Sequence, residues 1–144
     1  MNKDGIIDKI LILKSELEQG GYDTLRRPVI ILLRNKNGEL RKAFENNYIV
    51  LNGDDGGIHG DPYHGITIKN GFFSIEHFGG SGWRWNYVIT FKYDAQLKNW
   101  KLHQIGNETW HISKPEEFES HITTSKEFGT VLFKDYVNKL LKKS

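Results

Sequence analysis

The chain contains no cysteine among its 144 residues, and only three prolines and one methionine. The lack of cysteine excludes disulfides, thiolate metal sites and a cysteine nucleophile. No apolar run approaches the roughly eighteen residues that a membrane-spanning helix needs. The N-terminus, MNKDGIIDKILILKSE, lacks the shape of a signal peptide, because acidic residues interrupt it and no small-residue cleavage site follows. As written, the sequence predicts a cytoplasmic protein, or an envelope or secreted one if the natural chain extends upstream of Met1.

A concentration of charge of one sign is also missing. The formal net charge is +2, and basic residues gather only in the ending NKLLKKS. This is a weak electrostatic footprint for nucleic acid. An apolar content of 38% with 12% aromatic residues is typical of a folded globular domain. We therefore expect a single domain over residues 1–144, taken as a monomer, with no membrane or nucleic-acid partner.

Short runs rich in β-branched and aromatic residues dominate residues 1–113. The later runs alternate apolar and polar residues, the period of a half-buried strand. Asn-Gly pairs at Asn37-Gly38 and Asn70-Gly71 predict hairpins, so we expect an antiparallel meander or a sandwich-like sheet. The expected strands cover Ile6–Leu13, Pro28–Arg34, Tyr48–Leu51, Gly65–Lys69, Phe72–Phe78, Trp83–Tyr93, Asn99–Ile105 and Glu108–Ser113.

Helix is expected only in residues 114–144. A short turn is predicted at KPEEFESH, which Pro115 and two glutamates would open. In VLFKDYVNKLLKK, apolar residues recur at spacings of three and four and form a stripe flanked by lysines: Phe133, Tyr136, Val137, Leu140 and Leu141. The predicted fold class is thus mainly β, with an antiparallel sheet over residues 1–113 and one or two short C-terminal α-helices.

The N-terminal NKDGIID matches the end of a calcium loop of the Asp-x-Asn-x-Asp-Gly-x-x-Asp type. Its oxygen ligands would come from Asn2, Asp4 and Asp8, with Gly5 making the bend. The first aspartate of the pattern would precede Met1, and calcium takes about six to eight oxygens. We therefore interpret the motif as an Asp-Gly turn entering a strand, and expect no metal and no other cofactor.

The stretch NGDDGGIHGDPYHG, residues 52–65, combines glycines with acidic residues and histidines. It is not a phosphate-binding loop, because a strand follows it and Gly-Lys-Ser/Thr is missing. A zinc site or a hydrolytic pair with His59 as base stays open, with ligands from Asp54, Asp55, His59, Asp61 and His64. The spacing matches no helical pair and the loop has no serine, which favours a structural connection whose glycines allow positive φ.

The run GGSGWRWNYVITFKY places Trp83 and Trp85 on one face of a strand and Arg84 and Asn86 on the other. Apolar residues continue the first face through Tyr87, Ile89, Phe91 and Tyr93. This pattern predicts a core-facing surface. In the alternative interpretation, Trp83 and Arg84 form an exposed binding patch beside the glycines, since tryptophan and arginine are common at interface hot spots.

Taken in order, several of these motifs resemble the C-terminal module of bacterial FG-GAP/VCBS-like proteins. The matching residues are Gly60-Asp61-Pro62, Lys69-Asn70-Gly71, Gly79-Gly80-Ser81 and Trp83-Arg84-Trp85. The resemblance implies a β-rich module without a known active site, often in secreted or envelope proteins. Small stand-alone relatives of this kind are similar to the immunity proteins of bacterial toxin systems, an analogy of fold rather than of site.

The sequence therefore predicts a non-catalytic protein-binding domain, an immunity protein that docks on a bacterial toxin. A nuclease is favoured, because its cleft must be basic and acidic residues would speed the encounter. The expected contact residues are Asp54, Asp55, His59, Asp61, Trp83 and Arg84. Two alternatives stay open: a truncated FG-GAP-type ligand-binding module of the envelope, and a metal-dependent hydrolase using His59, His64 and the loop aspartates.

Overall fold

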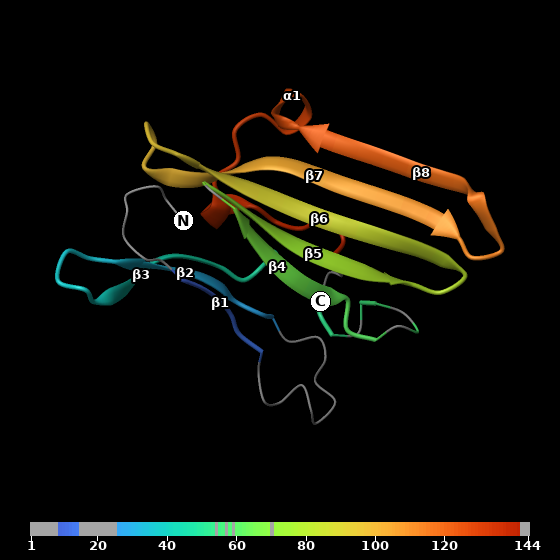
Figure 1. The fold of residues 1–144 in the computed structure, drawn as a ribbon, viewed down its shortest axis with the longest axis horizontal. Helices are drawn as coiled ribbons and strands as arrows, with labels where there is room; N and C mark the ends of the chain where they lie inside the picture. The colour runs from blue at the N-terminus through green and yellow to red at the C-terminus, as the bar shows by residue number, and fades with distance from the viewer. Residues whose placement is uncertain are drawn as a thin grey trace.

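The computed structural model describes residues 9–14, 26–53, 55–56, 58, 60–69 and 71–141. Within them, two antiparallel sheets make up the fold (Figure 1). The three-stranded sheet has the order β1-β2-β3, and the five-stranded sheet is a meander in the order β4-β5-β6-β7-β8. The predicted mainly-β, antiparallel class is confirmed. The strands are β1 (Lys9–Ile12), β2 (Val29–Arg34), β3 (Leu40–Asn46), β4 (Tyr63–Lys69), β5 (Phe72–Gly80), β6 (Trp83–Asp94), β7 (Asn99–His111) and β8 (Lys114–Thr124).

Both hairpins expected at Asn-Gly pairs are present. Gly38 has a φ of 85° in the turn between β2 and β3, and Gly71 has a φ of 78° between β4 and β5. Positive φ is strained for residues with a Cβ, so glycine at these positions allows tight reversals. Such short connections place consecutive strands side by side, as the meander requires.

The core lies where the two sheets face each other. On β6, Tyr87, Ile89 and Phe91 are buried, as the alternation predicts. The neighbouring strand β5 contributes Phe73 and Ile75, which are also fully buried. From the three-stranded sheet and the C-terminal segment, the same cluster receives Val29, Ile31, Phe133 and Tyr136.

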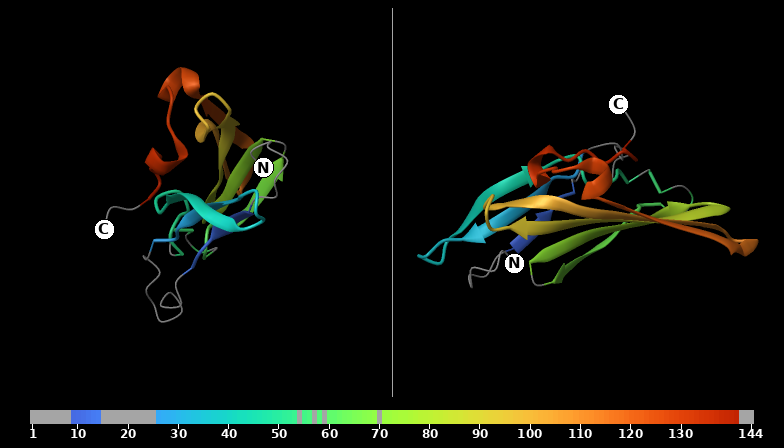
Figure 2. Two further views of the ribbon diagram at one scale, coloured as in Figure 1. Left: turned by 90° about the vertical axis from the view of Figure 1, so that its left-hand side faces the viewer. Right: turned by 90° about the horizontal axis from the view of Figure 1, so that it is seen from above.

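The five-stranded sheet is longer than the sheet that covers it. Strands β6, β7 and β8 run for 12, 13 and 11 residues, against 4, 6 and 7 for β1, β2 and β3. Seen from above, the ends of these long strands extend beyond the three-stranded sheet (Figure 2). We call this region, residues 78–86 and 108–122, the far half of the five-stranded sheet.

Three details of the strand prediction are wrong. The runs Asn99–Ile105 and Glu108–Ser113, expected as two strands, belong to one continuous strand, β7, which ends at His111. Leu40–Asn46 forms β3, although no strand was expected there, and Tyr48–Leu51 forms no strand. The Asn46 side chain accepts a hydrogen bond from the Tyr48 backbone N–H at 2.6 Å. This local bond turns the chain out of the ladder, and Ile49, Val50 and Leu51 then enter the core as an irregular segment.

The helical segment expected over residues 114–144 is also wrong in extent. Residues 114–124 form β8, because Lys114 and residues 119–124 pair with the exposed side of β7, with a register shift between them. Among the described residues, helix is limited to α1 (Ser125–Phe128) and the 3-10 turn η2 (Phe133–Asp135). Thr124 and Glu127 form a capping box at the N-terminus of α1.

The last described residues pack against the core in an extended path. The buried Asn46 donates from Nδ2 to the carbonyls of Phe133 and Tyr136, at 2.6 and 2.8 Å. Asn138 donates in the same way to the Ile49 carbonyl at 2.9 Å. These long-range bonds replace the helical ones that the apolar spacing predicted. Phe133 and Tyr136 are buried as expected, whereas Val137 is 58% exposed.

Candidate functional site

The glycine-rich loop is organised by contacts within itself and to β5. The backbone N–H of Asn52 donates to Asp55 Oδ2 at 2.9 Å, and the Asp55 N–H donates to the Asn52 carbonyl at 3.1 Å. Gly56 accepts a hydrogen bond from Gly80, and a Cβ at Gly56 would lie 1.9 Å from the Gly60 carbonyl oxygen. The described part of the loop thus has the architecture of the structural connection that the sequence favours.

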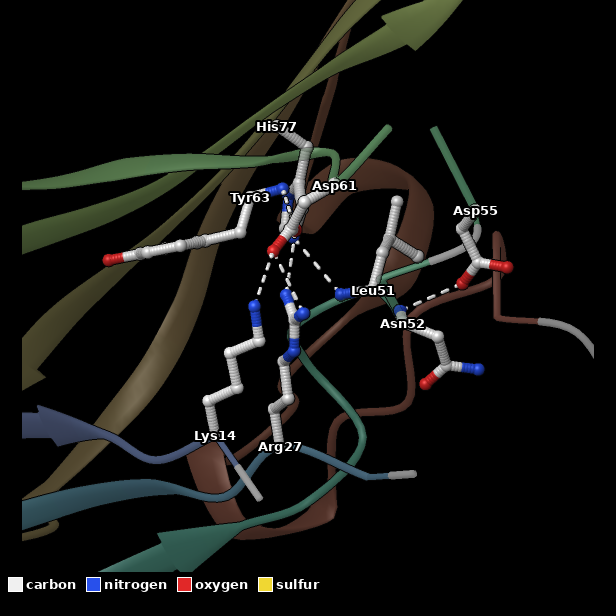
Figure 3. Close-up of polar contacts among 8 residues, drawn as sticks. All are labelled: Lys14, Arg27, Leu51, Asn52, Asp55, Asp61, Tyr63 and His77. Carbon is white, nitrogen blue, oxygen red and sulfur yellow. Dashed lines mark hydrogen bonds and ion pairs between the residues drawn. The ribbon is translucent and has the colours of Figure 1, made fainter. Parts of the chain in front are cut away.

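Asp61 lies at the end of this loop and is held by a buried arginine (Figure 3). Arg27, whose side chain is 3% exposed, donates Nη1 and Nη2 to the two carboxylate oxygens at 2.7 and 2.8 Å. Lys14 Nζ lies 3.7 Å from the same carboxylate, and the Tyr63 N–H donates to it at 3.0 Å. Burial raises the pKa of Asp61, but the bonds from Arg27 and Tyr63 and the two positive charges outweigh it and lower the pKa.

This arrangement changes the role expected of Asp61. Arg27 precedes β2 and Lys14 follows β1, so the bidentate pair ties the three-stranded sheet to the loop that leads into β4. Two cations surround one carboxylate, and the group as a whole is not acidic. Asp61 therefore has a structural role, and contact of its 38% exposed side chain with a partner stays a prediction.

His77 on β5 is the second buried polar side chain of this junction (Figure 3). It is 1% exposed, and its Nε2 accepts a hydrogen bond from the Leu51 N–H at 3.2 Å. Burial lowers the pKa of His77 to about 4, assisted by the charge of Arg27 and opposed by the Tyr87 backbone and Asp61. The ring is thus neutral near pH 7 and anchors the irregular segment before the loop.

The geometry of a metal-dependent hydrolase does not assemble in the part of the chain that is described. No group of three or more histidine, aspartate or glutamate side chains lies close enough there to hold a metal ion. His64 is exposed, and its ring centroid lies 6.4 Å from that of Phe78. The expected loop residues Asp54 and His59 lie outside the described residues, as do the calcium-loop candidates Asn2, Asp4 and Asp8.

Aromatic side chains cross the far half of the five-stranded sheet. We call Phe78, Trp110 and Phe118, from β5, β7 and β8, the aromatic row. Its ring centroids are 6.3 Å apart between the first two members and 6.1 Å apart between the last two. Phe78 has the opposite parity to the buried residues of β5, so the row lies on the outer face of the sheet. Phe118 is 50% exposed.

The aromatic row has polar and apolar neighbours on the same face. Arg84 on β6 pairs in register with Trp110, and its buried Nε makes no hydrogen bond. Ile122 is 57% exposed on β8, with the same parity as Phe118. Phe78, Arg84 and Trp110 are half-buried, and a guanidinium among partly exposed aromatic rings is a composition common at the centres of protein interfaces.

Trp83 and Arg84 do not share one surface. The expected alternation is confirmed, so Trp83 lies on the face of β6 opposite to Arg84. Trp83 is 57% exposed at the tip of the sheet, where its ring packs edge-on against His111 at 5.1 Å. Of the expected contact residues, Arg84 joins the aromatic row and Trp83 lies on the other side of the tip.

Sequence reasoning missed β8, and with it Phe118 and Ile122. Residues 114–122 of this strand are all exposed, including Glu116, Glu117 and Glu119. A period-two signal was available in Phe118, Ser120 and Ile122, but Pro115 followed by two glutamates is also a typical helix start.

No protein-family model, curated protein or solved structure matches this chain. The resemblance to FG-GAP/VCBS-like modules therefore stays a prediction. None of the helices among the described residues is long and apolar enough to cross a membrane.

Proposed function

We propose that this chain is a protein-binding domain that docks through the far half of its five-stranded sheet, and that it is an immunity protein that neutralises a bacterial toxin. The observation that carries the docking surface is the aromatic row, bordered by Arg84 and the 57% exposed Ile122. Large rings and arginine dominate the energetic centres of protein interfaces. Contiguous exposed apolar side chains rimmed by polar ones mark such sites on soluble proteins.

The charges beside the aromatic row favour a basic partner. Glu116, Glu117 and Glu119 lie on β8 next to Phe118, and Glu108 lies on the outer face of β7. Glu117, which also lies 3.8 Å from Lys114 Nζ, and Glu119 are on the other face of the same edge, and an acidic edge beside an apolar centre steers a positively charged protein into contact. A nuclease toxin fits this chemistry, since its cleft must attract nucleic-acid phosphates. In this proposal the glutamates of β8 add to the acidic contact expected of Asp54, Asp55 and Asp61.

The test begins with capture of partners from a lysate of the source organism by the tagged protein. The captured partner is then titrated against the variant Phe118→Ser. We expect the variant to bind about thirtyfold more weakly, the effect of losing an interface hot spot of about 2 kcal/mol. Leu97→Ser is the matched control, because Leu97 is 51% exposed in the β6–β7 turn at the opposite end of the sheet.

The two parts of the proposal fail separately. Equal affinity of the Phe118→Ser and wild-type proteins would overturn the docking surface. A captured partner whose toxicity or nuclease activity is unaffected by a stoichiometric amount of this protein would overturn the immunity role and leave the binding role standing.

A further inference from the structure

We propose that β8 is a docking edge, onto which a basic, extended segment of the partner adds as a further strand of the five-stranded sheet. The inference rests on the proposed protein-binding function, and it names both the mode of docking and the chemistry of the segment.

The first step is the position of β8 in the sheet. The order β4-β5-β6-β7-β8 leaves one side of β8 without a neighbouring strand, and no other described strand lies beyond it (Figure 1). From Glu119 to Thr124 the strand pairs in regular register with β7. In an antiparallel edge strand, alternate residues direct both N–H and C=O groups away from the sheet. The Thr124 N–H is used by the capping box of α1, where it donates to Glu127 Oε2 at 2.7 Å, so the groups that can pair with an added strand are those from Glu119 to Thr123.

The second step is the alternation of side chains along β8. Phe118 and Ile122 lie on the outer face with the aromatic row, whereas Glu117 and Glu119 have the opposite parity. A strand that adds to this edge places its own side chains beside both sets, as cross-strand neighbours. The complementary segment therefore alternates apolar residues, which contact Phe118 and Ile122, with cationic residues, which contact the glutamates.

The third step is the selection of a basic partner over a second copy of this chain. Residues 114–124 hold three glutamates and one lysine, a formal charge of −2, in a chain whose formal charge is +2. Two β8 edges paired with each other would bring glutamates together, and like charges on neighbouring strands destabilise the pairing. Pro115 also lacks a donor at one end of the strand. The carboxylates that oppose self-pairing attract a cationic strand.

The test uses a synthetic peptide of alternating lysine and valine, about nine residues long, which is the length of a long β-strand. It is added to the isotopically labelled full chain, and exchange of backbone amides with solvent is followed by NMR. We expect alternate amides between Glu119 and Thr123 to exchange at least about tenfold more slowly when the peptide is bound. The double variant Glu117→Lys/Glu119→Lys should bind the peptide at least about tenfold more weakly.

Two controls separate strand addition from simple charge attraction. Glu39→Lys/Glu45→Lys makes the same change of net charge at exposed positions of the three-stranded sheet, and should leave peptide affinity within about twofold of wild type. The same peptide with alternate backbone nitrogens methylated keeps its charge but cannot pair with β8, so it should not bind.

The proposal is overturned if the lysine-valine peptide fails to bind, if it binds without slowing exchange in β8, or if the methylated peptide binds equally well. These results are distinct from those for the captured partner. If Phe118→Ser loses affinity for the partner but the peptide does not protect the amides of β8, the docking surface is retained and strand addition at β8 is rejected. If the peptide protects the amides of β8 but Phe118→Ser binds the partner as tightly as wild type, the docking surface around the aromatic row is rejected.

Discussion

At the scale of single residues, several buried or half-buried polar side chains hold the fold together. Arg27 and Asp61 form a bidentate ion pair, and His77 accepts a backbone hydrogen bond in the core. A buried polar group is costly unless it is paired, so each of these side chains fixes the position of the segment that it contacts. The polar contacts of Arg27, Asp61 and His77 therefore explain the position of the glycine-rich loop.

The protonation of His77 predicts a loss of stability in acid. Its pKa falls from the ordinary 6.5 to about 4 on burial, so between these values the unfolded chain binds a proton that the folded chain does not. The free energy of unfolding then decreases as the pH falls through this window, by about 3 kcal/mol from this histidine alone. Urea denaturation at a series of pH values measures the slope.

The variant His77→Gln isolates this effect, since a glutamine oxygen can still accept the bond from Leu51. We expect it to lose most of the difference in stability between pH 6.5 and pH 4. An unchanged slope in His77→Gln would show that other groups cause the acid sensitivity.

At the scale of elements, the sequence predicted those strands whose signals are local. The Asn-Gly hairpins depend on glycine at positive φ, and the two faces of β6 depend on a period of two over its whole length. Both properties belong to the segment itself and hold in any surroundings.

Elements whose conformation depends on hydrogen bonds to residues far away in the sequence could not be predicted in this way. The segment around Phe133 and Tyr136 has helical spacing, but its carbonyls are bonded to Asn46, 87 and 90 residues away. Likewise β8 looks like a helix start until β7 supplies a partner for its backbone. The candidate site was the least predictable part, because Phe118 comes to lie beside Trp110, and Ile122 opposite Gly106, only through the pairing of β8 with β7.

Asn46 gives an element-scale prediction. Its side chain makes three hydrogen bonds from a position that is 4% exposed, and Asn46→Ala would leave the carbonyls of Phe133 and Tyr136 buried without those donors. We expect the free energy of unfolding to decrease by about 2–4 kcal/mol, and the amides of residues 131–141 to exchange faster with solvent. Denaturation and hydrogen exchange by mass spectrometry measure the two effects.

Asn35→Ala is the control for this prediction. Asn35 accepts two backbone hydrogen bonds in the exposed β2–β3 turn, so its loss is compensated by water. Asn35→Ala should lower the free energy of unfolding by less than half as much as Asn46→Ala, and should leave amide exchange in residues 131–141 unchanged. If Asn46→Ala and Asn35→Ala behave alike, the C-terminal segment is held by its apolar contacts instead.

At the scale of the whole molecule, the two sheets differ in length and in charge. The three-stranded sheet covers the core, and the five-stranded sheet extends beyond it with the aromatic row on its outer face (Figure 2). Charge is divided as well. Strand β8 carries a formal −2 while the chain carries +2, so the remaining residues carry +4. A basic partner is therefore attracted by one edge and repelled by much of the remaining surface.

This uneven distribution of charge predicts how association with the captured partner depends on salt concentration. Long-range attraction between exposed charges acts on the rate of encounter and is screened within about 8 Å at physiological ionic strength. The association rate constant should therefore fall severalfold when salt is raised from low to physiological concentration, while the dissociation rate constant changes little. Stopped-flow mixing gives the first constant and surface plasmon resonance the second.

The variant Glu117→Gln/Glu119→Gln assigns the attraction to β8. It should associate more slowly than wild type at low salt and at nearly the same rate at high salt, where the charges of both proteins are screened. Glu39→Gln/Glu45→Gln removes the same charge from the three-stranded sheet and should not slow association. If both double variants slow association equally, net charge alone steers the partner. If only the β8 variant does, the partner approaches this edge before the aromatic row is buried.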